Sequence, residues 1–212
     1  MSQPGTDIAG ERIALVQQAF ELEYLTLGWL AVEAVVAIVS GLAAKSLALT
    51  AFGIDSLIEL ASATVVLWRL TIELRQGEAF AEDIEKAAAR AGALLLFALA
   101  AYLVAGAAWK LATRHGAEFS FLGLTISALA IPVMLYLSRR KLQLAEALGS
   151  RALRTDAMES LACGALAIVV IVALLAQIAI GAWWVDALAS LTLAWLLIRE
   201  GREAWESEAD ED

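Results

Sequence analysis

The 212-residue chain is poor in several residue types that soluble and secreted domains depend on, with one cysteine, two prolines and one histidine. A single cysteine, Cys163, excludes an intrachain disulfide. Only 18% of the residues are charged and 61% are hydrophobic, whereas a soluble domain carries roughly 25% charged residues. The net charge of −9 argues against nucleic-acid binding. The composition therefore indicates a protein that lies in a lipid bilayer.

Apolar runs long enough to cross a membrane recur along the chain. A membrane-spanning helix needs ~20 predominantly apolar residues. We predict an all-α membrane protein with three parts: a cytoplasmic N-terminal segment (1–22), a six-helix transmembrane transport domain (23–199) and an acidic cytoplasmic tail (200–212). The six predicted spans are 24–44, 46–67, 91–111, 119–137, 155–179 and 185–198.

The positive charges predict the orientation of these spans. Cytoplasmic segments of membrane proteins carry an excess of Lys and Arg. If both termini are cytoplasmic, twelve of the fifteen Lys and Arg residues lie on that side, including those of a basic connector at 139–154. Only Lys45, Lys110 and Arg114 then lie outside. We therefore expect a multi-pass protein of the cell inner (plasma) membrane with both termini in the cytoplasm.

An internal repeat with an offset of 104 positions relates the second predicted span to the fifth. An odd number of spans per repeat means that the second half is inserted upside down, a plan common among transporters. The sequence therefore predicts two inverted three-helix halves. The matching positions are Ser46, Ala48, Leu49, Ser56, Leu57, Ala61, Ala63, Val65 and Val66 with Ser150, Ala152, Leu153, Ser160, Leu161, Ala165, Ala167, Val169 and Val170.

Two pairs of potential metal ligands occupy the same register of this repeat. Asp55 and Glu59 lie four residues apart on one face of the second span, and the offset places them on Glu159 and Cys163. Carboxylates within a membrane are costly unless they face a partner, a cavity or a metal. Because the two helices run antiparallel, both pairs are expected near the middle of the bilayer. Three carboxylates and a thiol are enough for a tetrahedral divalent ion.

The ligand types leave several metals open. A thiolate favours Zn²⁺, Cd²⁺ or Co²⁺, whereas carboxylates without imidazole also suit Mn²⁺ or Fe²⁺. These ligands bind metal in their deprotonated forms, so metal binding is coupled to protons as counter-ions, which predicts proton antiport. No phosphate-binding loop or nucleophile triad is visible, and we do not expect an enzyme.

Four further side chains carry alternative interpretations. Asp156, one turn before Glu159, is a helix cap, an access ligand or a fourth ligand in place of Cys163. Cys163 is otherwise a small buried hydrophobe. Glu33 is a candidate for proton coupling, or it pairs with a polar group inside the bundle. Asp186 is predicted to be the N-cap of the sixth helix.

Three segments resemble the cation diffusion facilitator family: SLALTAFGIDSLIE, SRALRTDAMESLAC and GAWWVDALASLTLAWLLIREG. The resemblance covers residues 30–206 and implies six-helix protomers, homodimers and efflux of divalent metal in exchange for protons, most often of zinc. The best-known zinc branch places His or Asp, and Asp four residues later, at each helix. Here these positions are Asp55, Glu59, Glu159 and Cys163. The family's usual cytoplasmic C-terminal domain is not found, so the chain resembles a short branch of the family.

The sequence therefore predicts a homodimeric exporter of a divalent transition metal, with zinc as the first candidate and manganese or iron as alternatives. One rival is a membrane metal sensor or regulatory subunit that keeps the site and does not transport. The other is a structural helix bundle in which the acids form buried hydrogen-bonded pairs.

Overall fold

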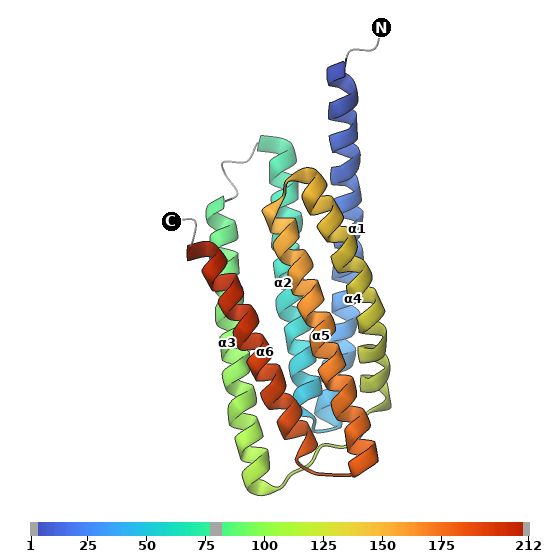
Figure 1. Ribbon diagram of the computed structural model, residues 1–212, viewed down its shortest axis with the longest axis vertical. Helices are drawn as coiled ribbons and strands as arrows, with labels where there is room; N and C mark the ends of the chain where they lie inside the picture. Colours follow the sequence, from blue (N-terminus) through green and yellow to red (C-terminus); the bar gives the residue numbers. More distant parts are fainter. Residues whose placement is uncertain (1–3, 77–81, 210–212) are drawn as a thin grey trace.

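Six long helices make up the computed structural model, which describes residues 4–76 and 82–209 (Figure 1). They run alternately up and down, so that α1 begins and α6 ends at the same end of the bundle. This end is named the terminal end here, and the other is the opposite end. The helices are α1 (Pro4–Ala43), α2 (Leu47–Gln76), α3 (Glu82–Thr113), α4 (Phe121–Leu148), α5 (Arg151–Ile180) and α6 (Val185–Ala209).

Length and composition qualify five of these helices, α1 to α5, to cross a membrane. The apolar part of α6, 185–198, is shorter, because charged residues follow from Arg199 onwards. This stretch nevertheless packs along α3 within the bundle (Figure 1). The prediction of an all-α membrane protein is confirmed.

The pairs of helices that pack against each other follow the predicted repeat. The pair α1–α2 corresponds to α4–α5, and the equivalent helices pack on each other as α1–α4, α2–α5 and α3–α6. The starts of α2 and α5 also match. The Ser46 hydroxyl accepts a hydrogen bond from the Leu49 amide (3.1 Å), and the Ser150 hydroxyl accepts one from the Leu153 amide (3.4 Å). Both serines cap the amides at the start of a helix, so the two halves share their local geometry as well as their sequence.

Close approach of α1 and α2 depends on two glycines. A Cβ atom added at Gly41 would lie 2.6 Å from the backbone nitrogen of Thr50, and one added at Gly53 would lie 2.7 Å from that of Ile38. Small residues of this kind let membrane helices approach until their backbones touch. The α1–α2 hairpin is therefore a tight unit.

The helices extend beyond the predicted spans in several places, and α6 continues to Ala209 through most of the predicted acidic tail (200–212). The structure has α1 running unbroken from Pro4, so the segment before the first span continues that helix. The basic connector predicted at 139–154 is mostly helical, because α4 continues to Leu148 and α5 begins at Arg151. Between them, Gly149 ends α4 in a left-handed conformation (φ 65°), which glycine adopts without strain.

Candidate cation site

A cavity of about 690 Å³ lies between α2, α3, α5 and α6. Its deepest acidic residue along α2 is Asp55, and its walls extend to Arg154 and Glu203 near the terminal end. Arg154, Arg199 and Glu203 are exposed, so the cavity reaches the surface at this end. Three of the predicted ligands, Asp55, Glu59 and Glu159, line it together.

The carboxylates in this cavity lack sufficient partners. Asp55 and Glu59 are each only 5% exposed. Both carboxylate oxygens of Glu59 and Oε2 of Glu159 are buried without a hydrogen-bond partner. A buried carboxylate in this condition is costly unless it holds a proton or faces a cation. The cavity is therefore suited to protons or a positively charged ligand.

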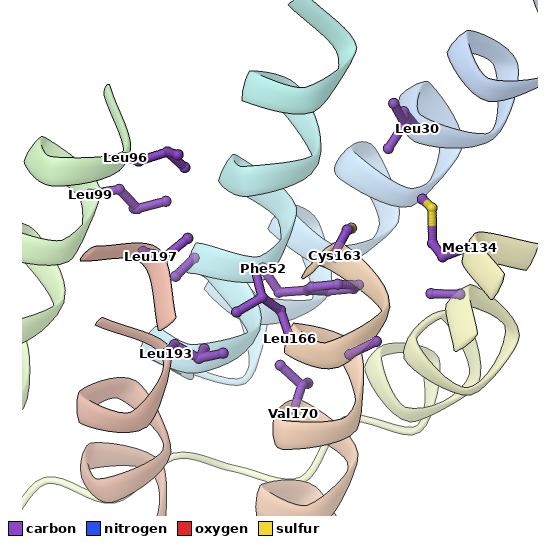
Figure 2. Close-up of a cluster of buried hydrophobic side chains, with 14 of the residues drawn as sticks. Leu30, Phe52, Leu96, Leu99, Met134, Cys163, Leu166, Val170, Leu193 and Leu197 are labelled. Atoms are coloured by element: carbon purple, nitrogen blue, oxygen red, sulfur yellow. The ribbon is translucent and has the colours of Figure 1, made fainter. Parts of the chain in front are cut away.

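Between the cavity and the opposite end, apolar side chains fill the interior of the bundle. Phe52 of α2, Leu166 of α5, and Leu193 and Leu197 of α6 belong to one buried cluster (Figure 2). Phe52 lies one turn before Asp55 on the side of the opposite end. This cluster separates the carboxylates from the opposite end, so the cavity has access from the terminal end.

Cys163 lies behind the cavity and does not line it. Its thiol is 1% exposed and donates a hydrogen bond to Oε1 of Glu33 (3.4 Å). Glu33 also accepts hydrogen bonds from Ser56 (2.7 Å) and from the indole of Trp29. Glu33 thus accepts hydrogen bonds from three donors, which agrees with the alternative that it pairs with polar groups inside the bundle.

Asp156 belongs to a different cluster from Glu159. Lys141 of α4 donates to Oδ2 of Asp156, and its Nζ lies 3.4 Å from Oε2 of Glu23 on α1. All three side chains are completely buried, at 0% or 1% exposure. Removing Lys141 would leave two buried carboxylates without a cation, which is strongly destabilising. Asp156 therefore has the contacts of a structural residue that ties α1, α4 and α5 together.

Sequence reasoning missed Glu23 and Lys141. The sequence places Lys141 in the basic connector predicted at 139–154, whereas it is 0% exposed within α4. A signal for it exists in the sequence. It continues the apolar positions Met134 and Leu137 at helical spacing, and both are buried. Glu23 likewise lies between buried Leu22 and Thr26 on the inner face of α1.

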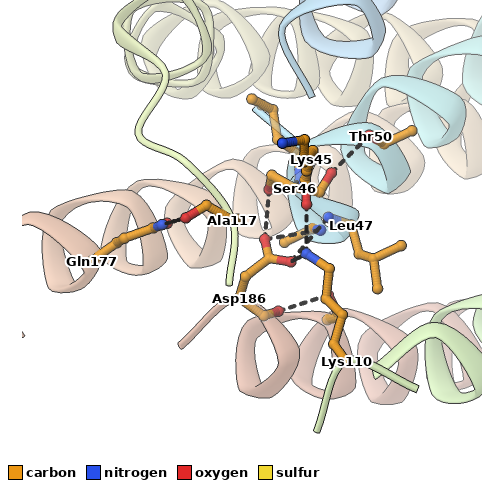
Figure 3. Close-up of polar contacts among 11 residues, drawn as sticks. Lys45, Ser46, Leu47, Thr50, Lys110, Ala117, Gln177 and Asp186 are labelled. Atoms are coloured by element: carbon orange, nitrogen blue, oxygen red, sulfur yellow. Dashed lines mark hydrogen bonds and ion pairs between the residues drawn. The ribbon is translucent and has the colours of Figure 1, made fainter. Parts of the chain in front are cut away.

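A second polar cluster lies at the opposite end (Figure 3). Asp186, in the first turn of α6, accepts hydrogen bonds from the Ser46 hydroxyl, from the Leu47 amide (3.0 Å) and from Nζ of Lys110 (2.7 Å). The prediction that Asp186 caps its own helix is wrong. Its carboxylate instead caps the N-terminus of α2, where unpaired amides and the helix dipole favour a negative charge.

Among the described residues, no group of three or more His, Cys, Asp or Glu side chains is arranged so that it could hold a metal ion as it stands. The carboxylates of Asp55, Glu59 and Glu159 share a cavity without converging on one point. A cation bound there would require side-chain rotations, for which the cavity leaves room.

Comparison with known families identifies the domain. The family model for the cation efflux transmembrane domain matches residues 25–209. The match begins within α1, ends within α6 and includes both helices that bear the paired ligands. No curated protein sequence matches the chain.

Proposed function

Because the chain belongs to the cation efflux family, we propose that it exports a divalent transition-metal ion, zinc first, in exchange for protons. Membership of this family identifies a multi-pass membrane transporter of metal cations. The choice of zinc, the proton exchange and the ligand set are inferences from the residues.

One observation carries this proposal: Glu59 and Glu159 present unpartnered buried oxygens to a cavity that reaches the surface at the terminal end of the bundle. A purely structural bundle would bring a buried cation to these carboxylates, as Lys141 does for Asp156 and Glu23. Carboxylates left without partners next to a passage are instead suited to a ligand that comes and goes.

The proposed ligands are Asp55, Glu59 and Glu159, with Cys163 as the fourth. Cys163 would join them by giving up its hydrogen bond to Glu33. Glu33 is the adjacent acceptor for the thiol proton, which agrees with the predicted role of Glu33 in proton coupling. We leave Asp156 out of the set, because Lys141 already neutralises it.

The direction of transport is inferred from charge and access. The Lys and Arg distribution favours a cytoplasmic terminal end, so the cavity would be loaded from the cytoplasm. Metal would displace protons from the carboxylates on this side. After the terminal end closes and the opposite end opens, protons would displace the metal, because both compete for the same oxygens. We expect this cycle to run in homodimers of the inner membrane, as the family resemblance implies.

Calorimetric titration of the purified protein with Zn²⁺, Mn²⁺, Fe²⁺, Co²⁺ and Cd²⁺ tests the proposal, together with metal uptake into liposomes. The wild type should bind and transport, and Asp55→Ala and Glu159→Ala should lose both activities while keeping their thermal stability. Folded wild-type protein that binds no metal would leave the structural bundle as the explanation. Binding without transport would favour a metal sensor.

A further inference from the structure

Acidic residues also line the cavity from α6, which is not one of the two helices, α2 and α5, that carry the repeated ligand pairs. Glu200, on the last turns of α6, lines the same cavity as Asp55, Glu59 and Glu159. It is half-buried there. Among the described residues, no ion pair or hydrogen bond is found for its side chain. The charged groups with the largest influence on it are acidic: Asp55, Glu159, Glu59 and Glu203.

The neighbouring Glu203 provides an internal comparison. It lies one turn further along α6 and also lines the cavity, but its side chain is 59% exposed and accepts a hydrogen bond from Nε of Arg199 (2.7 Å). That arginine is thus engaged at the mouth, and Arg154 is exposed on the other wall. In the part of the chain that the structure describes, no ion pair joins either arginine to Glu200.

Five carboxylates from three helices line one cavity of about 690 Å³, and one of them, Glu203, is paired with Arg199. Like charges in a partly desolvated space repel each other strongly, and a cation or protons relieve the repulsion. The unpartnered oxygens of Glu59, which is 5% exposed, show that relief is needed in the cavity itself and not only at its mouth.

The acidic residues at the two ends of α6 differ in their hydrogen bonding. At the opposite end Asp186 is bonded to Lys110 and to the start of α2. At the terminal end Glu200 faces the cavity without such bonds. The proposed ligands Asp55, Glu59 and Glu159 lie on α2 and α5, and none of them lies on α6. If Glu200 also binds the cation, the cation contacts α6 directly.

We propose that Glu200 is the access ligand of the cation path, binding the divalent ion on the terminal side of Asp55, Glu59 and Glu159 and passing it to them. This proposal rests on the proposed function. A carboxylate near the mouth raises the local concentration of cations and holds a partly dehydrated ion before the deeper site takes it.

The test compares Glu200→Gln with the matched control Glu203→Gln and with Glu159→Gln in the deeper site. Zn²⁺ and Mn²⁺ alone are titrated into each detergent-purified protein, and initial rates of Zn²⁺ uptake into liposomes are measured over a range of concentrations. Glu200→Gln should weaken binding by about tenfold, the loss of one charged ligand, and raise the KM more than it lowers the maximal rate. Glu203→Gln should match the wild type, and Glu159→Gln should abolish binding.

Several outcomes separate this inference from the proposed function. If the wild type binds and Glu159→Gln does not, but Glu200→Gln equals the wild type in affinity and KM, the access role is overturned and the transporter remains. If the wild type binds nothing, both fail. Because Gln removes repulsion, Glu200→Gln should melt at or above the wild-type temperature, and a marked decrease would assign Glu200 a structural role instead. Glu200→Asp, which keeps the charge, should recover part of the lost affinity.

Discussion

Nζ of Lys110 lies 2.7 Å from Oδ2 of Asp186, with both side chains almost fully buried. Through this pair the end of α3, the start of α6 and the N-terminus of α2 are joined at the opposite end of the bundle (Figure 3). The cavity reaches the surface at the other end. A transporter that exposes its site alternately would need to release this contact when the opposite end opens.

Breaking the Lys110–Asp186 pair should cost stability. Asp186→Asn leaves a buried ammonium without a counter-charge and weakens the cap of α2, so we expect a loss of about 3–5 kcal/mol. Thermal unfolding in detergent measures it. Lys45→Met, which removes an exposed pair with Glu118, is the control and should have almost no effect. The double variant Lys110→Met/Asp186→Asn should be more stable than Asp186→Asn, and equal stability would contradict the pairing.

Asp156 and Glu159, one turn apart on α5, should respond oppositely to removal of charge. Asp156→Asn should lower thermal stability, because it removes the hydrogen-bonded ion pair with Lys141. It should keep metal binding, because Asp156 does not line the cavity. Glu159→Gln should abolish metal binding and keep or raise stability, because one unpartnered buried charge is removed. Parallel melting and metal titration of the two variants give the comparison. Loss of metal binding in Asp156→Asn, with its fold intact, would make Asp156 a ligand.

Removal of the Ser46 hydroxyl should be more harmful than removal of the Ser150 hydroxyl. Both hydroxyls accept a hydrogen bond from an amide three residues later, which is worth ~1 kcal/mol at a helix N-cap. Ser46 also donates to Asp186. Ser46→Ala should therefore destabilise the protein by about 1 kcal/mol more than Ser150→Ala. Equal melting temperatures would show that the contact with Asp186 adds nothing.

Cys163→Ser should change the choice of metal. A thiolate prefers Zn²⁺ and Cd²⁺, whereas oxygen ligands suit Mn²⁺. If Cys163 is the fourth ligand, the variant should lose Zn²⁺ and Cd²⁺ affinity by more than tenfold and retain most of its Mn²⁺ affinity. Competition titrations measure the ratio. An unchanged ratio would leave Cys163 as a buried donor to Glu33 alone.

Metal binding should weaken as pH falls. Protons and metal compete for the carboxylates of Asp55, Glu59 and Glu159, so acidification fills these oxygens with protons and lowers the affinity. Binding should release protons, which calorimetry detects as a dependence of the observed heat on the ionisation enthalpy of the buffer. In liposomes, acidifying the receiving side should accelerate transport. Binding and transport that do not respond to pH would contradict proton exchange.

Much of this architecture follows from local properties of the sequence. The length of an apolar run determines whether a helix can span the bilayer, and the repeat places Ser46 and Ser150 at the same helix start. The register that pairs Asp55 with Glu159 follows from the same repeat, and the structure has both residues in one cavity. These features depend on residues close together in the chain or on a regular offset.

The partners of the charged residues were decided by tertiary structure. Asp186 caps α2, 140 positions from its hydrogen-bond partner Ser46, and Lys141 lies between α1 and α5. Glu200 reaches the cavity because α6 packs beside α2 and α5. The sequence alone determined which helices form and that Asp55, Glu59 and Glu159 lie within them. Which acid is neutralised and which is left facing the cavity depends on interhelical packing, because a buried charge is stabilised by whatever neighbouring helices bring within a few ångströms.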